Sequence, residues 1–484
     1  MSTHPLEDLF HPRSIAVVGA SADEQQRGSG FTNALLQAGF RGKIYPVNPK
    51  YPVIQGLKSY PRVTDIPDPV DYVISSVPAH VVPTMLEDCG QKGVKVVHLY
   101  TARFSETGRE GTLELEQEVL GIARKHGMRL IGPNCMGLYY PKEGISFRPG
   151  MPKQSGPVGL ISQSGQMVGE ITTMASERGV YFSKAISYGN ALDLNECDYL
   201  EYLAQDVDTT VILMYVEGLR DARRFLSILR QTTPQKPVII LKGGRGRAGA
   251  RATASHTASL AGSIQMWNTA LAQAGALSAS RLNELIDLAV SFRFLPPLYQ
   301  ARVGVAGGAG GASVIAADEC EEAGLDVAPL TPEFREELKN MGVSIWDWIS
   351  NPADMSITER PGFDVADMLQ MMAKSGLYDF LITMVHEHPR RWRPWTNAED
   401  HLKQFGLDAR ELRPVLAIVG ERSPSIHDTE ENEADWRTGR EIRQKLVDYG
   451  VPFYPTIGRA ARAARKLVDY YQWKASLTSG PRTG

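Results

Sequence analysis

One pattern recurs along this chain: a short apolar, often β-branched run, then a turn of small or polar residues, then a segment with apolar positions at helical spacing. Short apolar runs bounded by turn residues are typical of buried strands in parallel sheets. The strands that this pattern predicts are 14–18, 43–47, 72–77, 94–100, 129–131, 158–161, 210–215, 237–241, 302–306, 380–385, 415–419 and 451–454. Because strands and helices alternate, we expect the α/β class with parallel sheets.

Two stretches break the pattern and predict domain boundaries. Residues 136–157 are rich in Gly, Pro and Lys and have no periodicity, and residues 295–298 contain two adjacent prolines. A chain of 484 residues is also too long for one core, and about 150 residues per domain gives three domains. We therefore expect domains at 1–140, 155–295 and 300–475, with two helices over 263–294 closing the second and disorder from about Ser476.

Composition narrows the class of protein. The hydrophobic content of 43% and net charge of −3 argue against disorder and provide no electrostatic footprint for nucleic acid or an anionic membrane. The N-terminus lacks the features of an export signal, and no stretch reaches about 18 apolar residues, so we expect a cytoplasmic protein. The four cysteines are scattered without CxxC pairing, which favours reduced core thiols over a disulfide framework or a metal site.

Four loops follow strands of the first domain: 48–50, 78–80, 101–103 and 132–135. Loops at the same edge of a parallel sheet converge, so these four are predicted to line one groove, although each alone also fits an ordinary turn. After the opening strand, Gly19, Ser21, Gly28 and Gly30 do not form GxGxxG. A standard dinucleotide fingerprint is therefore absent, which leaves room for a different nucleotide.

Two further turns of small residues open helices and are candidate phosphate sites. They comprise Ser162, Gln163, Ser164 and Gly165 in the second domain and Gly308, Ala309, Gly310 and Gly311 in the third. Such a turn presents several free backbone N–H groups at the positive end of a helix. A plain N-cap by Ser162 or Ser164 fits the first turn equally well. The glycines of the turn at 308–311 carry an entropic cost on folding that turn geometry alone does not explain.

His256 lies in the segment Lys242–Gly262, among Gly, Ala, Ser and Thr, after the strand 237–241. Small neighbours at the carboxyl end of a strand leave an imidazole free to move and react. Glu217 follows the preceding strand and is a candidate to orient or activate His256. The alternative for His256 is a surface loop in which the histidine has no function, and the alternative for Glu217 is an ordinary solvated side chain.

Taken in order, ten motifs span nearly the whole chain: HPRSIAVVGAS, YPVNPK, SVPA, GPNCMGL, LISQSG, YGNALDL, YVEG, SHTASLAG, GGAGGASVIAAD and NPADM. This set resembles the α-type half of the nucleoside-diphosphate-forming acyl-CoA synthetases, which include succinyl-CoA synthetase and ADP-forming acetyl-CoA synthetase. The resemblance implies a Rossmann-like CoA-binding domain followed by two flavodoxin-like domains. It implies that His256 is phosphorylated during turnover and that Glu217 orients it. It also implies that CoA binds against Gly19, Ser21, Lys50, Val77, Pro78 and Asn134.

The residue chemistry is compatible with that assignment, because a neutral imidazole is a good nucleophile and phosphohistidine a reactive phosphoryl donor. One departure is Ala258 where relatives often have glycine, which stiffens the loop, and we expect retained activity. Another is the absence of a recognisable ATP-grasp domain. The resemblance therefore implies a separate ATP-grasp subunit that binds ATP or GTP with Mg, and hence an oligomer.

The function predicted is that of a subunit of a ligase that joins a small organic acid to CoA, with nucleoside triphosphate giving nucleoside diphosphate and phosphate. A rival from another class is a non-catalytic CoA or acyl-CoA binding protein with a regulatory or scaffold role. His256, Glu217 and both helix starts argue against it, because binding alone does not require them. A nicotinamide-dependent oxidoreductase is a third possibility, and the broken glycine fingerprint argues against it. The sequence does not identify the acid.

Overall fold

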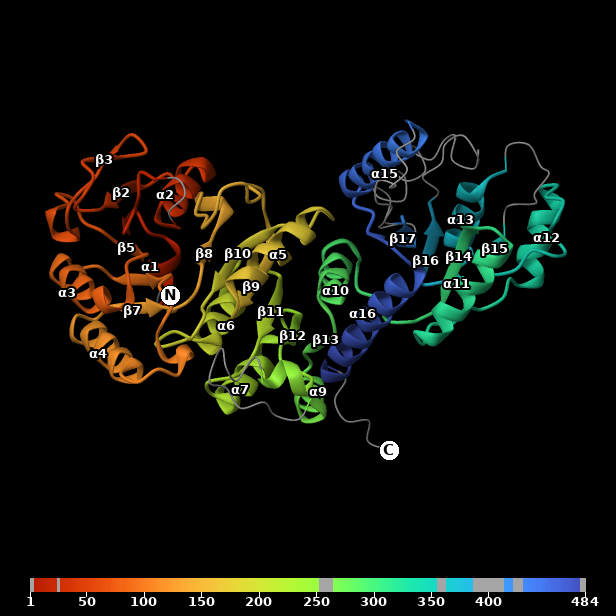
Figure 1. The fold of residues 1–484 in the computed structure, drawn as a ribbon. Coiled ribbons are helices and arrows are strands. Elements are labelled where there is room, and N and C mark those ends of the chain that lie inside the picture. The colour runs from red at the N-terminus through yellow and green to blue at the C-terminus, as the bar shows by residue number, and fades with distance from the viewer. Residues whose placement is uncertain are drawn as a thin grey trace. The chain divides into compact units, whose positions relative to one another are not determined.

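The computed structural model describes residues 4–23, 27–251, 264–354, 363–385, 413–420 and 430–478 (Figure 1). Contacts within the chain divide it into two compact units, Met1–Leu285 and Ile286–Gly484. The first unit contains two large sheets and the second contains one. Every helix in the described ranges is too short or too polar to span a lipid bilayer.

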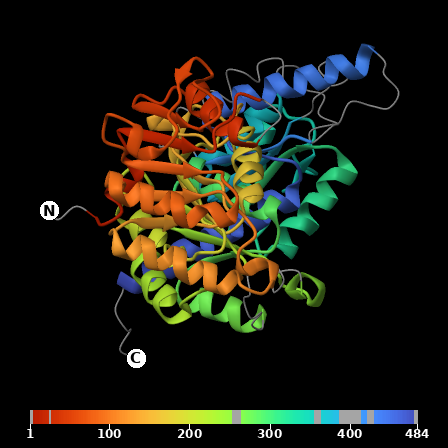
Figure 2. The same cartoon turned by 60° about the vertical axis from the view of Figure 1, so that its left-hand side comes forward.

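The first sheet has five parallel strands in the order β2-β1-β5-β6-β7. They are β1 (Ser14–Val18), β2 (Lys43–Val47), β5 (Tyr72–Ser75), β6 (Val96–Leu99) and β7 (Arg129–Ile131). The helices are α1 (Glu7–Phe10), α2 (Arg27–Ala38), α3 (Val82–Lys92) and α4 (Thr112–Lys125), and a hairpin of β3 (Val53–Ile54) and β4 (Leu57–Lys58) follows β2. Figure 2 brings this part of the chain forward.

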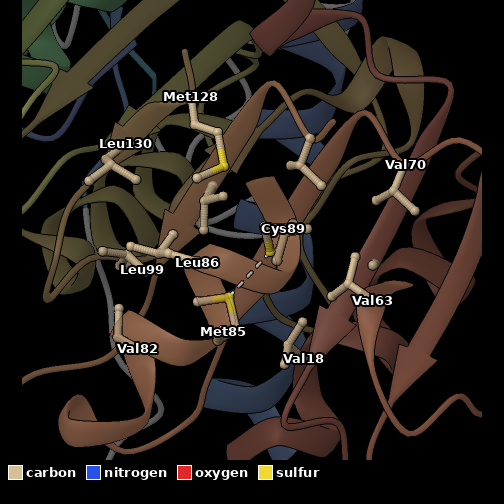
Figure 3. Packing of buried hydrophobic residues seen from close by; sticks show 14 of the residues in the cluster. Val18, Val63, Val70, Val82, Met85, Leu86, Cys89, Leu99, Met128 and Leu130 are labelled. Carbon is tan, nitrogen blue, oxygen red and sulfur yellow. Dashed lines mark hydrogen bonds between the residues drawn. The ribbon is translucent and has the colours of Figure 1, made fainter. Parts of the chain in front are cut away.

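The core of this part lies between the sheet and helices α3 and α4. Because the strands are covered on both sides, β1, β5 and β6 are buried along their whole length, as the continuous apolar runs predict. Figure 3 shows Met85, Leu86 and Cys89 of α3 in this core with Leu99 of β6. The Cys89 thiol contacts the Met85 sulfur at 3.4 Å. This packing fixes the sheet whose strand ends carry the predicted loops.

The second sheet has six strands in the order β13-β12-β11-β9-β10-β8. They are β8 (Gly137–Tyr139), β9 (Ser155–Ser162), β10 (Phe182–Ser187), β11 (Val211–Val216), β12 (Val238–Lys242) and β13 (Leu277–Ala279). All are parallel except β8, which runs antiparallel to β10 at the edge. The helices are α5 (Gly165–Ser176), α6 (Glu196–Gln205), α7 (Ala222–Thr232), α9 (Ile264–Gln273) and α10 (Leu282–Phe294).

The sequence prediction missed two strands of this sheet. The irregular connection expected at 136–157 contains β8 and the first residues of β9. The two helices expected over 263–294 are present as α9 and α10, but β13 lies between them. Strands of three residues are too short to show periodicity, and the Leu-Ser-Ala sequence of β13 has no β-branched residue.

The third sheet, in the second unit, has five parallel strands in the order β15-β14-β16-β17-β18. They are β14 (Val303–Gly308), β15 (Ala353–Asp354), β16 (Phe380–Met384), β17 (Val415–Ile418) and β18 (Phe453–Tyr454). The helices are α11 (Gly310–Glu322), α12 (Pro332–Asn340), α13 (Val365–Lys374), α15 (Glu430–Asp448) and α16 (Ile457–Thr478). The disorder expected from Ser476 is wrong for residues 476–478, because α16 continues and the Ser476 hydroxyl caps the Trp473 carbonyl.

The three large sheets of the described residues share one strand order. Counted along the chain within each sheet, and leaving out the edge strand β8, the order is second, first, third, fourth, fifth, which is flavodoxin-like. The predicted α/β class with parallel sheets is therefore confirmed. In open α/β sheets, ligands bind where the strand order reverses, at the carboxyl ends of the first and third strands. In the second sheet these are β9 and β11, and the residues that follow them are Gln163 and Glu217.

Candidate active site

A cavity of about 800 Å³ lies within the first unit, at the carboxyl ends of strands from both of its sheets. Three of the four predicted loops line it, 78–80, 101–103 and 134–135, whereas the loop 48–50 does not. Among the predicted site residues, its lining includes Val77, Pro78, Asn134, Gln163, Ser164, Gly165 and Glu217. Gly19, Ser21, Lys50 and Ser162 are not part of the lining. The structure thus places part of the predicted CoA site and the first predicted phosphate site at one cavity.

The start of α5 forms one wall of this cavity. Ser164 is the N-cap, and its hydroxyl accepts a hydrogen bond from the Met167 N–H at 3.4 Å. The Ser162 hydroxyl donates to the Ser164 carbonyl at 2.7 Å. The N-cap prediction is therefore correct for Ser164. The positive end of the helix lies at the wall of the cavity, where it favours an anion.

Gly165 has a steric reason to be glycine. A Cβ atom there would lie 2.4 Å from Cγ of Met136, which belongs to the segment leading into β8. The first turn of α5 is therefore packed against the connection between the two sheets. An added side chain would displace either the helix start or that connection.

Glu217 is held at the switch point by hydrogen bonds to its own backbone and side chain. The Gln163 side-chain oxygen accepts from the Glu217 N–H at 2.7 Å and from the Gly218 N–H at 3.1 Å. The Tyr215 hydroxyl donates to Oε1 of Glu217 at 3.2 Å. Lys242 donates to the Glu217 carbonyl at 2.6 Å, and burial lowers the pKa of this lysine. The carboxylate is thus presented to the cavity from a fixed strand end.

His256 belongs to residues 252–263, which lie outside the described part of the chain. Its relation to Glu217 therefore stays a prediction. Residues 247–251, which the sequence suggested as loop, are helical, so the loop prediction was wrong for these residues. Their sequence is Arg-Ala-Gly-Ala-Arg, in which the good helix formers Arg and Ala flank a single glycine, and this is compatible with one helical turn.

A chain of hydrogen bonds connects the first sheet's loops to the second sheet. The Thr101 hydroxyl donates to the Val77 carbonyl at 2.7 Å, and the Asn134 N–H donates to the Thr101 carbonyl at 2.9 Å. The Asn190 N–H donates to the Pro133 carbonyl at 3.0 Å. The loops after β5, β6 and β7 therefore form one surface with the loop after β10.

Sequence reasoning missed Asn190 and Glu106, which complete this surface. The Asn190 side-chain amide donates to Oε2 of Glu106 at 2.8 Å. Glu106 also accepts from the N–H groups of Arg103, at 2.6 Å, and Phe104, at 3.0 Å. Asn190 follows a glycine in the YGNALDL motif, which was the one available signal. Glu106 gave none, because its partners are brought to it by the fold.

Cys135 lies in the cavity wall and is buried. Burial raises the pKa of its thiol, so the group is a neutral thiol rather than a nucleophilic thiolate. The Cys135 carbonyl contacts Nε2 of His98 at 3.0 Å, and burial lowers the pKa of His98 to about 4. Both side chains therefore serve the packing beneath the cavity.

The remaining predicted CoA residues lie at the ends of β1 and β2. Gly19 has φ +83°, and a Cβ there would lie 2.8 Å from the Ser76 hydroxyl, so the two strand ends approach closely at this switch point. The Ser21 hydroxyl is buried and accepts from the Asp23 N–H at 3.0 Å, while Lys50 is exposed. Their contacts with a ligand stay predictions.

The second predicted phosphate site lies in the second unit. Gly308 ends β14, Gly310 begins α11, and Ala309 between them provides no side-chain cap. A Cβ at Gly308 would lie 2.3 Å from the Met384 methyl group. The buried Ser313 hydroxyl in the first turn has no hydrogen-bond partner among the described residues. This helix start has the form of an anion cradle, and its ligand stays a prediction.

Comparisons with known proteins agree with this architecture. Residues 13–141 match a family model described as a CoA binding domain, and residues 155–292 match a succinyl-CoA ligase like flavodoxin domain. The α subunit of acetate–CoA ligase [ADP-forming] II of Pyrococcus furiosus is 40% identical over 96% of this chain and 97% of its own. The acetate–CoA ligase [ADP-forming] of Methanocaldococcus jannaschii is 39% identical over 73% of this chain but only 49% of its own.

A similarity in structure covers the whole chain. It is to the dinucleotide forming acetyl-coenzyme A synthetase 1 of Ca. Korarchaeum cryptofilum, solved in complex with phosphate and ADP. That protein superposes with a TM-score of 0.80 and 29% identity, over 100% of both chains.

Proposed function

Because the chain belongs to the family of ADP-forming acetate–CoA ligase α subunits, we propose that its cavity is where acyl-CoA exchanges its acyl group with phosphate. The chain is the α-type part of an acid–CoA ligase that forms a nucleoside diphosphate. Its substrates are a small organic acid, CoA and phosphate. We further propose that its domains are those expected from the sequence, 1–140, 155–295 and 300–475.

The proposed transfer of the acyl group needs no reactant other than acyl-CoA and phosphate. A phosphate oxygen attacks the thioester carbon of acyl-CoA, the C–S bond breaks, and the proton of the phosphate passes to the thiolate. The products are an acyl phosphate and CoA. The imidazole of His256 then attacks the phosphorus, which releases the acid and leaves phosphohistidine. Transfer of this phosphoryl group to a nucleoside diphosphate completes the reaction, and each step is reversible.

The observation that carries this proposal is the composition of the cavity lining. Val77, Pro78 and Asn134, predicted to bind CoA, line the same cavity as the start of α5 and Glu217. A thioester bound by the first group is thereby close to an anion held by the second. Positioning and charge stabilisation are what phosphoryl transfer requires from a protein.

We assign Glu217 as the residue that orients His256, and the α11 start at Gly308–Gly311 as a second cradle for the phosphoryl group. Two cradles suit a phosphoryl group that is transferred between two places. The absence of a side-chain cap at Ala309 supports this assignment, since it leaves the first amides of α11 to another acceptor.

The nucleotide step requires a partner in this proposal. The P. furiosus relative is named as an α subunit, and the M. jannaschii relative is about twice as long as the region that matches. We therefore propose a separate ATP-grasp subunit that binds ATP or GTP with Mg, and an αβ assembly. Purified chain that made acyl-CoA from acid, CoA and nucleoside triphosphate without a partner would contradict this part.

The central test is labelling with radioactive inorganic phosphate. The full chain is incubated with phosphate and a panel of acyl-CoAs, and we expect acid-labile, base-stable label that is lost in His256→Asn. We expect Glu217→Gln to retain CoA binding by calorimetry and to lower the labelling rate about 10²-fold or more, since an orienting group then lacks its charge. Label that persists in His256→Asn would refute the histidine relay.

A further inference from the structure

Arg103 has a backbone conformation that favours glycine. Its φ is +77°, whereas bulky residues rarely adopt positive values. Glu106 holds it there, because both oxygens of this one carboxylate accept N–H groups of the turn 103–104. The same carboxylate accepts from Asn190 of the second sheet. The protein thus maintains an arginine at a position where glycine would be easier to accommodate, and strained residues of this kind cluster at ligand sites.

The charges of the residues that line the cavity suggest a role for the Arg103 side chain. Among the described residues that line it, Arg103 is the only lysine or arginine, and Glu217 is the only carboxylate. Among the described residues, no carboxylate forms an ion pair with the Arg103 side chain. Phosphate and acyl phosphate both carry about two negative charges at neutral pH, and Glu217 adds another. The partial charge at the start of α5 amounts to about half a unit and does not balance them.

We propose that Arg103 binds the phosphate while its oxygen accepts the acyl group of acyl-CoA, and then the phosphoryl group of the acyl phosphate that forms. This inference rests on the proposed function. The planar guanidinium donates two parallel hydrogen bonds to phosphate oxygens, which an ammonium group cannot do. Arg103 approaches from the first sheet and the start of α5 from the second, so the anion is bound from both. Arg103 is in this sense a catalytic residue.

The phosphates of CoA itself are a less suitable partner. Of the residues predicted to bind CoA, Gly19 and Lys50 lie at the ends of β1 and β2, and Lys50 is the only one with a positive charge. In the strand order, β6 is two strands away from β1, which corresponds to about 10 Å, and on the side of β7. Arg103 follows β6 and lines the same cavity as the start of α5 and Glu217, whereas Gly19 and Lys50 do not line it.

The test compares Arg103→Gly and Arg103→Lys with the wild type, and uses Arg109→Ala as a control for loss of charge in the same loop. Glycine suits the positive φ, so Arg103→Gly is expected to fold and to have at least the thermal stability of the wild type. The readout is the concentration of inorganic phosphate that gives half-maximal labelling of the full chain. Acetyl-, butyryl- and succinyl-CoA serve as acyl donors, and calorimetry measures CoA affinity.

We expect Arg103→Gly to raise the required phosphate concentration about 10–100-fold and to leave CoA affinity unchanged. Arg103→Lys should lie between glycine and wild type, and Arg109→Ala should match the wild type. A loss confined to succinyl-CoA would assign Arg103 to a second carboxylate of the acyl group and overturn the proposal, as would a loss of CoA affinity. Unchanged phosphate dependence would refute this inference alone, whereas absence of label in the wild type would refute the proposed function with it.

Discussion

Replacing Gly189 with alanine tests whether the contact between the two sheets of the first unit holds the cavity together. Gly189 has φ +55°, and a Cβ there would lie 2.3 Å from the Pro133 carbonyl oxygen and 2.5 Å from that of Asn134. Both are backbone atoms, so relief requires movement of the loop after β7. That loop is fixed by hydrogen bonds to Asn190 and Leu192.

The expected loss of stability in Gly189→Ala has two parts. A left-handed conformation costs an L-residue about 1–2 kcal/mol, and forcing an extra methyl group into a packed site costs about 1–3 kcal/mol. Gly189→Ala should therefore lower the free energy of unfolding by about 2–5 kcal/mol. Gly93→Ala is the matched control, because Gly93 has φ +78° with no atom near its added Cβ. The free energy of unfolding of Gly93→Ala should fall only by the cost of the left-handed conformation, about 1–2 kcal/mol.

Urea denaturation of the full-length variants measures both values, and calorimetry with CoA measures the consequence for the site. We expect Gly189→Ala to bind CoA more weakly, since Asn134 is displaced, and Gly93→Ala to bind it normally. Equal stability losses in the two variants, with unchanged CoA affinity, would refute the reasoning. The close contact between Gly189 and the loop after β7 would then not be needed to hold the cavity together.

Three further predictions concern buried groups. Lys184 is buried and its amine lies 2.8 Å from Oδ2 of the buried Asp206, so Lys184→Met should cost about 3–5 kcal/mol in urea denaturation, and adding Asp206→Asn should restore part of it. The pKa of buried His98 is lowered from 6.5 to about 4, so the folded state binds fewer protons than the unfolded state. Stability present above pH 6.5 should fall by about 3 kcal/mol as the pH is lowered to 4, and denaturation of His98→Gln should lack this dependence. All four cysteines are buried, and burial raises the pKa of each, that of Cys197 to about 12. An aromatic disulfide reagent at pH 8 should therefore titrate none in the native protein and four in denaturant, and rapid native labelling would contradict this burial.

The main strands were predictable because parallel strands covered on both sides require continuous apolar sequence, as in 14–18 and 238–242. The strands that were missed are short and lie at sheet edges. β8 and β13 have three residues each, so hydrogen bonds to a neighbouring strand define them rather than any pattern of their own. Strand order was not predictable from periodicity, which says nothing about which strands pair.

For the candidate site, convergence of the loops followed from parallel topology, and Val77 and Asn134 do line one cavity with Ser164. The loop at Lys50 follows an edge strand and does not contribute. The role of Glu106 could not be predicted, because its three N–H donors come from two different sheets' loops. Arg103 stood in a predicted loop, but its positive φ is a property of the folded backbone alone.

The segment 132–136 carries the chain from β7 of the first sheet to β8 of the second and supplies Asn134 to the cavity wall. It is anchored by the Leu192 N–H at the Gly132 carbonyl and by the Ser187 hydroxyl at the Met136 N–H. The covalent link between the two sheets is therefore part of the pocket itself. For protein engineering this means that the first unit cannot be split, circularly permuted or lengthened at this point without losing the pocket. The two sheets share this link and the pocket, so we expect recombination with related ligases to succeed only at breakpoints elsewhere.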